Sequence, residues 1–335
     1  MATIKDVAAK AGVSIGTASN VLAGRRSVRP EAAERVRAAM AALDYSPNGI
    51  ARSLRGRSTR TIGLVVPDNA NPFFAETSWA IEQDCGAAGF ALMICNTGRS
   101  LDREAITIGM LLEKRVDGII VATSDNPRAL ADVVAAGVPL VVIDHDATGL
   151  AADAVVVDHR RGGELAARHL VSLGHRCLAC ITSPPERANA SRIQGFRSVL
   201  ADAGLELPDA AVHESDAHAG GGYRAARTLL ERDPATTAIF ASNDLVALGV
   251  IRASYDLGRP VPAALSVVGY DDISLADQVM PRLTTVRQPL RDIGRRASEI
   301  LRRRITDRAA PVERWVLPVE LVVRESTAAP TGRPS

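Results

Sequence analysis

The chain has 335 residues, of which 47% are hydrophobic and 23% charged, as expected for a globular protein with more than one domain. Residues 1–60 carry 11 Lys and Arg against four Asp and Glu, whereas the remaining 275 residues carry 29 against 34. A small basic region on a mildly acidic body favours a nucleic-acid partner. With no signal peptide and no apolar run of about 18 residues, the sequence predicts a cytoplasmic protein with no membrane partner.

The first 22 residues predict two short helices around a tight turn. Thr3 and Asp6 form the pattern of a helix-capping box, and apolar residues follow at helical spacing as far as Ala11. Gly12 suits the turn, and Ser14 caps a second helix. A third helix follows, with Pro30 in its first turn. Two short helices joined by a glycine turn predict a helix-turn-helix unit, whose second helix enters the major groove.

Four segments of the head, in this order, resemble the lactose-repressor (LacI/GalR) family: Ala2–Ser14, Thr17–Ser19, Tyr45–Asn48 and Ala51–Leu54. The resemblance implies that three hydroxyl residues contact phosphate, namely Ser14, Thr17 and Ser19. It also places Ile15, Gly16 and Asn20 at base-reading positions. Arg25 and Arg29, in the loop before the third helix, are expected to meet phosphate.

Three positions depart from the family's pattern. Gly16 has no side chain with which to read a base, and Asn20 stands where Arg or His is common. The amide of Asn20 suits the N6 and N7 edge of adenine. Ala23 replaces a usual Asn. We therefore expect an operator that differs from that of a typical member.

Residues 47–60 predict a hinge: a short helix from Pro47 to about Arg55, then a basic linker. Isolated helices shorter than about 12 residues are marginal in water, so this helix should need a partner. The resemblance implies that two such helices pair in the minor groove. There Leu54 wedges between base steps and Ala51 lies at the helix contact. Arg55 completes the expected DNA contacts.

From residue 61 onward, short apolar runs alternate with helical stretches, which is typical of parallel sheets covered on both faces. The runs are Ile62–Val66, Ala91–Cys95, Gly118–Ala122, Leu140–Ile143, Ala154–Val157, Leu178–Thr182, Ala238–Ala241 and Ser266–Gly269. Such folds bind ligands at the carboxyl ends of their strands. The predicted fold is thus an all-α helix-turn-helix head plus an α/β body of two lobes, like a periplasmic binding protein.

The resemblance extends over the body to about residue 326. The matching segments include Asn71–Phe74, Arg192–Phe196, Ser242–Asp244 and Val268–Asp272. It implies an effector cleft lined by Phe73, Asp144, Arg192, Asn243 and Asp271, to which the strand-end residues Asn71 and Ser124 are added. Carboxylates, an amide, a guanidinium and an aromatic ring suit a small sugar-like polyol.

Each of these residues has an alternative role. A strand-end Asp often caps the following helix, and Phe73 could belong to the core. Asp244 and Asp272 are expected to cap or brace. Ala217 stands where an aromatic residue often closes the pocket, so either the ligand is bulkier or His218 partly replaces the aromatic residue.

By the same resemblance, the chain crosses between lobes near residues 158, 288 and 318. One lobe would comprise residues 61–157 with 289–317, and the other residues 158–288 with 318–326. Residues 1–46 form the head. The tail, 327–335, lacks leucine heptads and is expected to be disordered, and the protein to be a homodimer.

The sequence argues against catalysis and against a bound cofactor or metal. No nucleophile–base pair, nucleotide loop or metal-ligand pattern of histidines is recognisable. Cys177 and Cys180 have C-x-x-C spacing, but residues three apart in a strand point to opposite faces. The main alternative is a solute-binding receptor without DNA function, which the basic head disfavours. The expected partners are therefore double-stranded operator DNA and a small effector.

Overall fold

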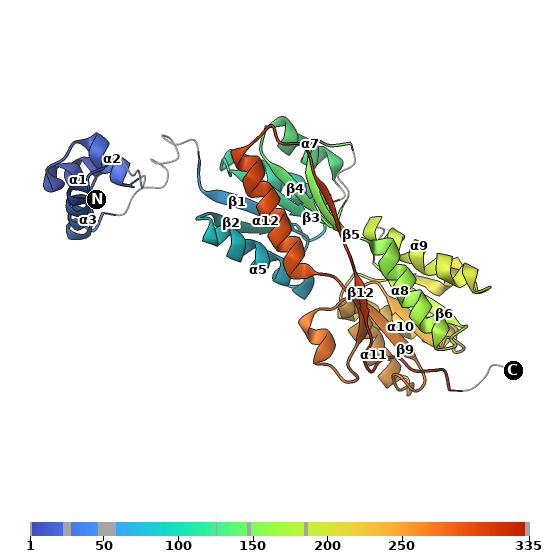
Figure 1. Cartoon of the computed structure of the whole chain (residues 1–335). Helices are drawn as coiled ribbons and strands as arrows, with labels where there is room; N and C mark the ends of the chain where they lie inside the picture. Colours follow the sequence, from blue (N-terminus) through green and yellow to red (C-terminus); the bar gives the residue numbers. More distant parts are fainter. Residues whose placement is uncertain are drawn as a thin grey trace. The chain divides into compact units, whose positions relative to one another are not determined.

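The computed structural model describes residues 2–22, 28–45, 58–124, 126–145, 149–183 and 187–331. It divides into two compact units, Met1–Thr59 and Arg60–Ser335, coloured blue and cyan-to-red in Figure 1. Most of the predicted hinge, including Ala51, Leu54 and Arg55, lies outside the described residues, and so does Arg25.

The first unit contains three helices: α1 (Ile4–Ala11), α2 (Ile15–Leu22) and α3 (Pro30–Ala42). The capping box at α1 is confirmed, because the Thr3 side chain accepts from the Asp6 amide and the Asp6 carboxylate accepts from the Thr3 amide. Gly12 ends α1 with φ of +62°, a left-handed conformation that favours glycine. The helices enclose a small core of Val7, Ala8, Ala11, Ala18, Val36 and Ala39.

The second unit contains two six-stranded sheets, one in each lobe. The first has the order β11-β5-β4-β3-β1-β2 and is parallel throughout. The second has the order β12-β10-β9-β8-β6-β7, and only β12 runs antiparallel to its neighbour. The strands of the first are β1 (Thr61–Val66), β2 (Ala91–Asn96), β3 (Gly118–Ala122), β4 (Leu140–Ile143), β5 (Asp153–Val157) and β11 (Arg314–Leu317). Those of the second are β6 (Leu178–Thr182), β7 (Val212–Glu214), β8 (Ala238–Ala241), β9 (Ser266–Asp271), β10 (Thr284–Arg287) and β12 (Glu320–Val322).

Helices cover both faces of each sheet. In the first lobe, α5 (Pro72–Ala87) and α12 (Leu290–Thr306) share one core cluster, while α6 (Leu101–Glu113) and α7 (Pro127–Ala135) share another. In the second lobe, α8 (His159–Ser172) and α9 (Arg187–Asp202) lie on one face, and α10 (Ala219–Arg232) and α11 (Asp244–Asp256) on the other. Two 3-10 turns complete it, Asp209–Ala211 and Ser274–Asp277. This is the predicted fold class.

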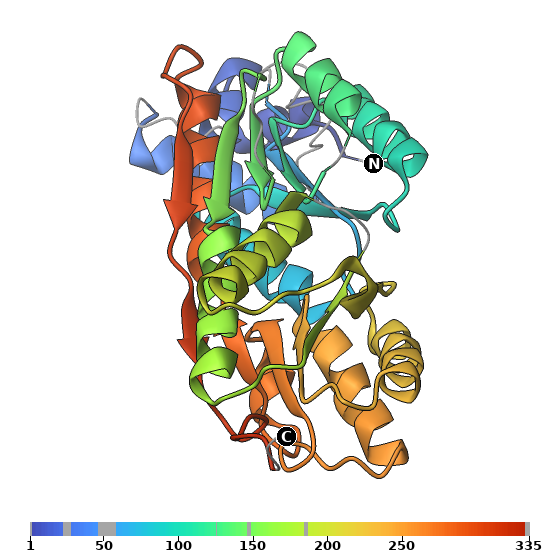
Figure 2. The same cartoon turned by 90° about the vertical axis from the view of Figure 1, so that its right-hand side faces the viewer.

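The chain passes from one sheet to the other three times: between β5 and α8, between β10 and α12, and between β11 and β12. In Figure 2 the last of these passages is visible as the red segment that runs alongside both lobes. Three segments of the chain therefore connect the lobes. The carboxyl ends of both sheets face the region between the lobes.

The predicted disorder of the tail is wrong for Thr327–Thr331. The hydroxyl of Thr327 lies 2.9 Å from His169 Nε2, and the carbonyl of Ala328 lies 3.0 Å from Ser266 Oγ and His175 Nε2. His175 precedes β6 and Ser266 begins β9, so these contacts hold the tail at the amino end of the second sheet, and His169 of α8 adds a further contact. The sequence pattern does not reveal such contacts between distant polar groups. Residues 332–335 lie outside the described part of the chain.

Candidate functional site

A polar cleft lies where the carboxyl ends of the two sheets meet. Its described lining residues come from both lobes and are mostly polar: Asn71, Phe73, Phe74, Arg99, Thr123, Asp144, Ser183, Asn189, Arg192, Asn243, Asp271 and Gln288. Its open volume is about 30 Å³, room for no more than about two water molecules. In this arrangement the cleft is closed on its own side chains.

Arg192 is the centre of the cleft's hydrogen-bond network. Its Nη1 donates to the Ser242 carbonyl at 2.6 Å, and its Nε donates to His159 Nδ1 at 3.2 Å. The guanidinium also stacks on the ring of Tyr270, with Cζ 3.7 Å from the ring centroid. A buried Arg needs such partners, and together they fix its orientation towards the cleft.

A buried contact between Asp144 and His159 joins the two lobes. Asp144 follows β4 in the first lobe and His159 begins α8 in the second, and Asp144 Oδ1 lies 2.7 Å from His159 Nε2. Because Nδ1 of the ring accepts from Arg192, the ring proton is assigned to Nε2, which faces the carboxylate. A chain of polar contacts thus runs from Arg192 through His159 to Asp144.

The two cleft carboxyls have opposite pKa shifts. Burial raises the pKa of Asp271 to about 7, because the opposing charge of Arg192 and the hydrogen bond from Gln288 offset the desolvation only in part. Burial alone would also raise the pKa of Asp144, but the close contact with His159 and the charge of Arg192 lower it. Asp144 is therefore ionised at neutral pH, whereas Asp271 titrates near neutral pH.

Asp271 is held by a neighbouring amide. Gln288 Nε2 donates to Asp271 Oδ1 at 2.7 Å, and the Gln288 amide N–H donates to the Asp271 carbonyl. Gln288 Oε1 is buried and has no hydrogen-bond partner among the described residues. An unpaired buried acceptor is costly, so this oxygen is a strong candidate to accept from a ligand.

The asparagines of the cleft have structural roles as well. Asn71 Oδ1 caps α5 by accepting from the Phe73 amide, and Asn243 Oδ1 caps α11 by accepting from the Val246 amide. The Asn243 Nδ2 group donates to the Ala217 carbonyl at 3.1 Å. Both side chains are thus fixed in place where they line the cleft.

The structure brings together six of the seven predicted effector residues but not Ser124. Ser124 is fully buried and donates to Glu104 Oε1 at 2.5 Å, and it is not among the lining residues. Phe73 lines the cleft and packs edge to face on Phe74, so it serves the core and the cleft together. His218 is half exposed, and its Nε2 lies 3.8 Å from Asp68 Oδ2 of the first lobe.

Asp244 and Asp272 brace the second lobe, as expected. Asp244 accepts from the Ile273 amide at 2.9 Å and from Thr285 Oγ1 at 2.6 Å, which ties the start of α11 to the segments after β9 and within β10. Asp272 pairs with Arg287 at 2.6 Å and with Arg324 at 2.7 Å. These contacts hold the loop that presents Asp271.

Close packing of α8 on α9 sets the position of Arg192. A Cβ atom on Gly163 would lie 1.9 Å from the Arg192 carbonyl oxygen, and one on Gly195 would lie 2.0 Å from the Arg160 carbonyl oxygen. The two helix backbones therefore touch at these glycines. This contact places the start of α9, with Asn189 and Arg192, beside His159.

Sequence reasoning missed several polar residues of the site, among them Ser183 and Gln288 of the cleft lining and His159, which contacts Asp144 and Arg192. Ser183 directly follows β6 and His159 comes two residues after β5. The strand-end rule used for the other candidates would have identified both. Gln288 follows β10, a strand that the apolar-run pattern did not predict because it begins with two threonines, Thr284 and Thr285.

The head exposes the predicted DNA-reading surface of α2. Ile15 and Gly16 are exposed, and Thr17, Ser19 and Asn20 are partly exposed, whereas Ala18 is buried against α1 and α3. Ser14 Oγ accepts from the Thr17 amide at 3.0 Å and lies 2.9 Å from Thr17 Oγ1. Arg29 is exposed before α3.

Two kinds of site are not found among the described residues. No group of three or more His, Cys, Asp or Glu could hold a metal ion there, and no described helix is long and apolar enough to cross a membrane. Cys177 is half-buried and Cys180 is fully buried in β6; burial raises the pKa of the Cys180 thiol, which disfavours the reactive thiolate.

Comparison with known proteins agrees with this architecture. Residues 3–48 match the family described as bacterial regulatory proteins, lacI family, and residues 167–327 match the periplasmic binding protein-like domain. The chain is 38% identical to the HTH-type transcriptional repressor PurR of Vibrio vulnificus over 97% of this chain and 98% of that protein. It is 30% identical to the lac repressor dimer bound to operator and the anti-inducer ONPF, with a TM-score of 0.88 over 98% of this chain and 99% of that one. A complex of the transcriptional regulator CelR with cellobiose is 34% identical, with a TM-score of 0.74 over 97% and 100%.

These matches span both units of the chain. They exclude the alternative of a solute-binding receptor without DNA function, and they exclude an enzyme. The chain belongs to the lacI family of bacterial regulatory proteins and is a ligand-responsive, DNA-binding transcriptional repressor.

Proposed function

We propose that this repressor binds a palindromic operator as a homodimer in the cytoplasm. We further propose that a small sugar or sugar derivative in the interlobe cleft sets its operator affinity. The observation that carries the effector class is the cleft's mixture of acceptors and donors. The carboxyls of Asp144 and Asp271 and the unpaired Gln288 Oε1 converge there with two guanidiniums, those of Arg99 and Arg192. A polyol supplies several hydroxyl donors and also acceptors for the guanidiniums.

The arrangement of aromatic residues also favours a polyol over a flat base. Phe73 and Phe74 lie edge to face with ring centroids 4.9 Å apart, so each ring is engaged with the other. Among the described lining residues they do not form a slot that would hold a planar ligand between two parallel faces. Two similar regulators were solved with sugars, one with cellobiose and one with ribose.

The effector class can be tested by calorimetric titration of the full-length protein with monosaccharides, disaccharides and purine bases. We expect saturable binding of a sugar that vanishes in Arg192→Met. Arg224→Met is the matched control, since its pair with Asp216 is exposed and lies outside the cleft. A purine base that binds more tightly than every sugar would reject the sugar proposal and leave the repressor assignment intact.

Operator recognition would rest on the exposed face of α2. Ser14, Thr17, Ser19 and Arg29 would contact phosphate, while Ile15, Gly16 and Asn20 face the base edges. The proposal also includes four residues on the basis of the sequence alone: Arg25, Ala51, Leu54 and Arg55.

Selection from a random DNA library should yield a palindrome, and Asn20→Ala should relax one base preference by about tenfold or more. Affinity should fall steeply with salt; a flat log–log plot would contradict the phosphate contacts.

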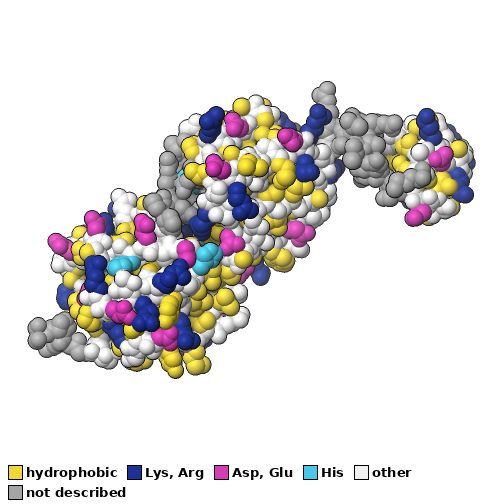
Figure 3. All heavy atoms as spheres, turned by 180° about the vertical axis from the view of Figure 1, so that it is seen from behind, with side chains coloured by type: hydrophobic (Ala, Val, Ile, Leu, Met, Phe, Trp, Pro, Cys, Tyr) yellow, Lys and Arg dark blue, Asp and Glu magenta, His cyan; other side chains and the backbone are white. Residues whose placement is uncertain are grey.

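Exposed apolar side chains support a homodimer. Ile106 and Met110, on one face of α6, are 71% and 40% exposed, and Tyr255 and Met280 of the second lobe are 75% and 92% exposed. From behind, hydrophobic side chains reach the surface of both lobes among the charged ones (Figure 3). We expect Ile106→Glu to shift the sedimentation coefficient towards that of a monomer; an unchanged dimer would exclude α6 from the interface.

A further inference from the structure

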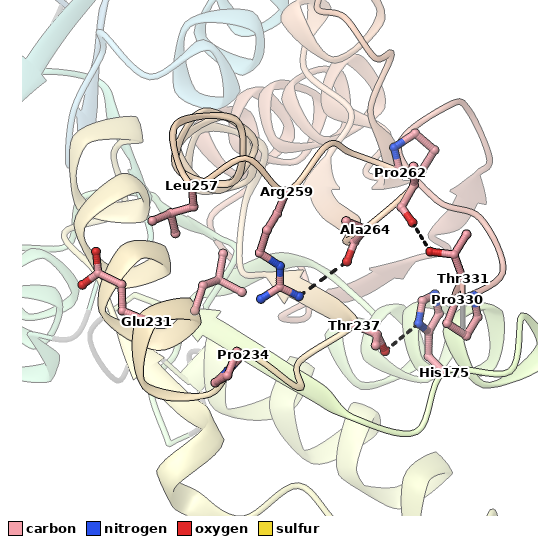
Figure 4. Close-up of a pocket in the computed structure, with 12 residues that line it drawn as sticks. His175, Glu231, Pro234, Thr237, Leu257, Arg259, Pro262, Ala264, Pro330 and Thr331 are labelled. Carbon is pink, nitrogen blue, oxygen red and sulfur yellow. Dashed lines mark hydrogen bonds between the residues drawn. The ribbon is translucent and has the colours of Figure 1, made fainter. Parts of the chain in front are cut away.

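A cavity of the second lobe lies at the sheet edge opposite the effector cleft. It has a volume of about 400 Å³ and is bounded by the segments that precede β6, β8 and β9, with the ordered tail as a further wall (Figure 4). Its size lies in the range of small-molecule pockets. The cleft uses the carboxyl ends of the same strands, so the two sites are separated by the length of the sheet.

Arg259 projects into this cavity and is only partly satisfied. Its Nη2 donates to the Thr236 carbonyl at 2.5 Å and lies 3.5 Å from the Ala264 carbonyl. Its Nη1 is buried and has no hydrogen-bond partner among the described residues. Burial lowers the pKa of Arg259, and the charge of Asp233 opposes that shift only in part. A partly buried guanidinium with an unpaired N–H group favours an anionic acceptor.

The other polar groups of the pocket are already engaged. His175 Nδ1 lies 2.9 Å from Thr237 Oγ1, and its Nε2 lies 3.0 Å from Ser266 Oγ. Thr331 donates to the Ala263 carbonyl at 2.7 Å, and Glu231 pairs with Arg227 at 2.7 Å on the exposed side of α10. Arg259 therefore supplies the open charged donor among the described lining residues.

The remaining walls are apolar, which limits what the anion can be. Leu230, Leu257, Pro262 and Pro330 surround the guanidinium (Figure 4 labels the last three). A single guanidinium with the carboxylates of Glu231 and Asp233 nearby suits a monoanion better than a phosphate dianion. Apolar walls suit a ligand with a hydrocarbon or aromatic body.

We propose that this pocket is a second ligand site, which binds a small organic carboxylate. The carboxylate pairs with the guanidinium of Arg259, and the apolar body packs against the leucines and prolines. The planar guanidinium matches a carboxylate in geometry as well as charge. The two sites have no lining residue in common, but they lie at opposite ends of β8 and α11: Thr237 precedes β8 and Leu257 follows α11 at the pocket, and Asn243 lies between these elements at the cleft.

The first test compares benzoate with benzamide, which has the same shape and no charge. Titration calorimetry of the full-length protein should give a Kd of about 1 mM for benzoate and binding weaker by about tenfold or more for benzamide. Methyl NMR should show shifts at Leu230 and Leu257 and none at Leu245, which lies beside the cleft. Equal binding of the two compounds, no binding of benzoate up to 10 mM, or shifts confined to Leu245 would each overturn the proposal.

Two variants complete the test. Arg259→Gln should lose the preference for benzoate over benzamide. Because Arg259 also donates to two carbonyl groups, the Arg259→Gln variant could fail to fold. In that case the second variant, Glu231→Gln, tests the proposal. Its side chain is exposed, and removal of its charge should tighten benzoate binding about twofold while benzamide binding stays unchanged. A folded Arg259→Gln that keeps the preference, or a Glu231→Gln with unchanged benzoate affinity, would refute a carboxylate held by Arg259.

Discussion

Asp271 combines a buried carboxyl with an unusual backbone. Its φ is +114°, and Asp144 and Ala217 also have positive φ, +60° and +67°. Such conformations are strained for residues other than glycine and persist where the surrounding structure enforces them. For Asp271 that enforcement comes from Gln288 and from the braces of Asp244 and Asp272. The strain therefore coincides with the loop that presents the carboxyl to the cleft.

We predict that effector affinity depends on pH through Asp271. The pKa of Asp271 is about 7 in the folded state and about 3.9 in the unfolded chain. At pH values between these two, the folded state therefore retains a proton that the unfolded chain has lost. Stability should therefore fall as pH rises through this window. An effector hydroxyl that donates to Asp271 needs the ionised form, so its affinity should rise about tenfold from pH 6 to pH 8.

Calorimetric titration at several pH values checks this expectation. Asp271→Asn should bind more weakly and show a flat profile over the same range. Asp144→Asn is the matched control, because the pKa of Asp144 is lowered and that carboxyl is ionised throughout. The effector affinity of Asp144→Asn should fall, while the dependence of that affinity on pH remains. A slope that survives in Asp271→Asn would assign the titration to another group.

At the level of elements, the sequence predicted the apolar strands and missed the others. The predicted runs coincide with β1 to β6, β8 and β9, whose residues are almost all apolar and, except in the edge strand β2, mostly buried. β11 and β12 are largely exposed edge strands, and β10 starts with two buried threonines. These strands are held by pairing with neighbours far along the chain, which leaves no local apolar signature.

The same distinction explains the residues of the cleft. Asp144, Asn243 and Asp271 follow predicted strands, so their shared edge could be inferred from the chain. Ser124 also follows a strand, but its side chain turns to Glu104 inside the first lobe. Gln288 depends on β10, which has no local apolar signature, whereas His159 follows the predicted strand β5 by two residues. Strand ends thus predict a position along the sheet edge but not the direction of the side chain.

The contact of α8 with α9 gives a prediction at this scale. Gly163→Ala would put a Cβ atom 1.9 Å from the Arg192 carbonyl oxygen, a backbone atom that cannot move without shifting α9. We expect a loss of about 1–3 kcal/mol in the free energy of unfolding and weaker effector binding, because Arg192 moves with its helix. Denaturant titration and calorimetry measure the two effects.

Gly109 provides the control. It also lies within a helix, α6, but a Cβ atom there would meet nothing within 4 Å. Gly109→Ala should stabilise the protein by about 0.5–1 kcal/mol, since alanine has the higher helix propensity. Similar losses in both variants would mean that the close approach of α8 and α9 does not determine the stability of this region.

Across the whole body, polar contacts between the lobes hold the cleft closed. Asp144 and His159 are buried and 2.7 Å apart, Glu76 Oε1 accepts from the Ser274 amide at 3.2 Å, and Asp68 lies 3.8 Å from the half-exposed His218. Buried pairs are costly to break, whereas exposed pairs contribute little. The buried Asp144–His159 contact should therefore dominate among these contacts, and a ligand that enters the cleft must replace it or use it.

We predict that His159→Ala opens the cleft in the absence of effector, because it leaves the Asp144 carboxylate buried without its partner. Energy transfer between labels at Arg128 in the first lobe and Glu206 in the second measures the closed fraction. The variant should lose about 3 kcal/mol of closing free energy. The double variant with Asp144→Ala should lose no more than either single variant. His218→Ala should change closing by less than about 1 kcal/mol, and an equal effect of the two histidines would contradict the dominance of the buried pair.

The same variant reveals how the two lobe arrangements relate to DNA. An effector can shift operator affinity only through a difference in its affinity for the open and closed forms. Operator affinity of His159→Ala, measured without effector, reports which form binds DNA. A fall means that the closed form binds the operator, so an effector that closes the cleft acts as a corepressor; a rise means that such an effector acts as an inducer. An unchanged operator affinity would disconnect cleft closure from DNA binding and would require the effector to act through another element.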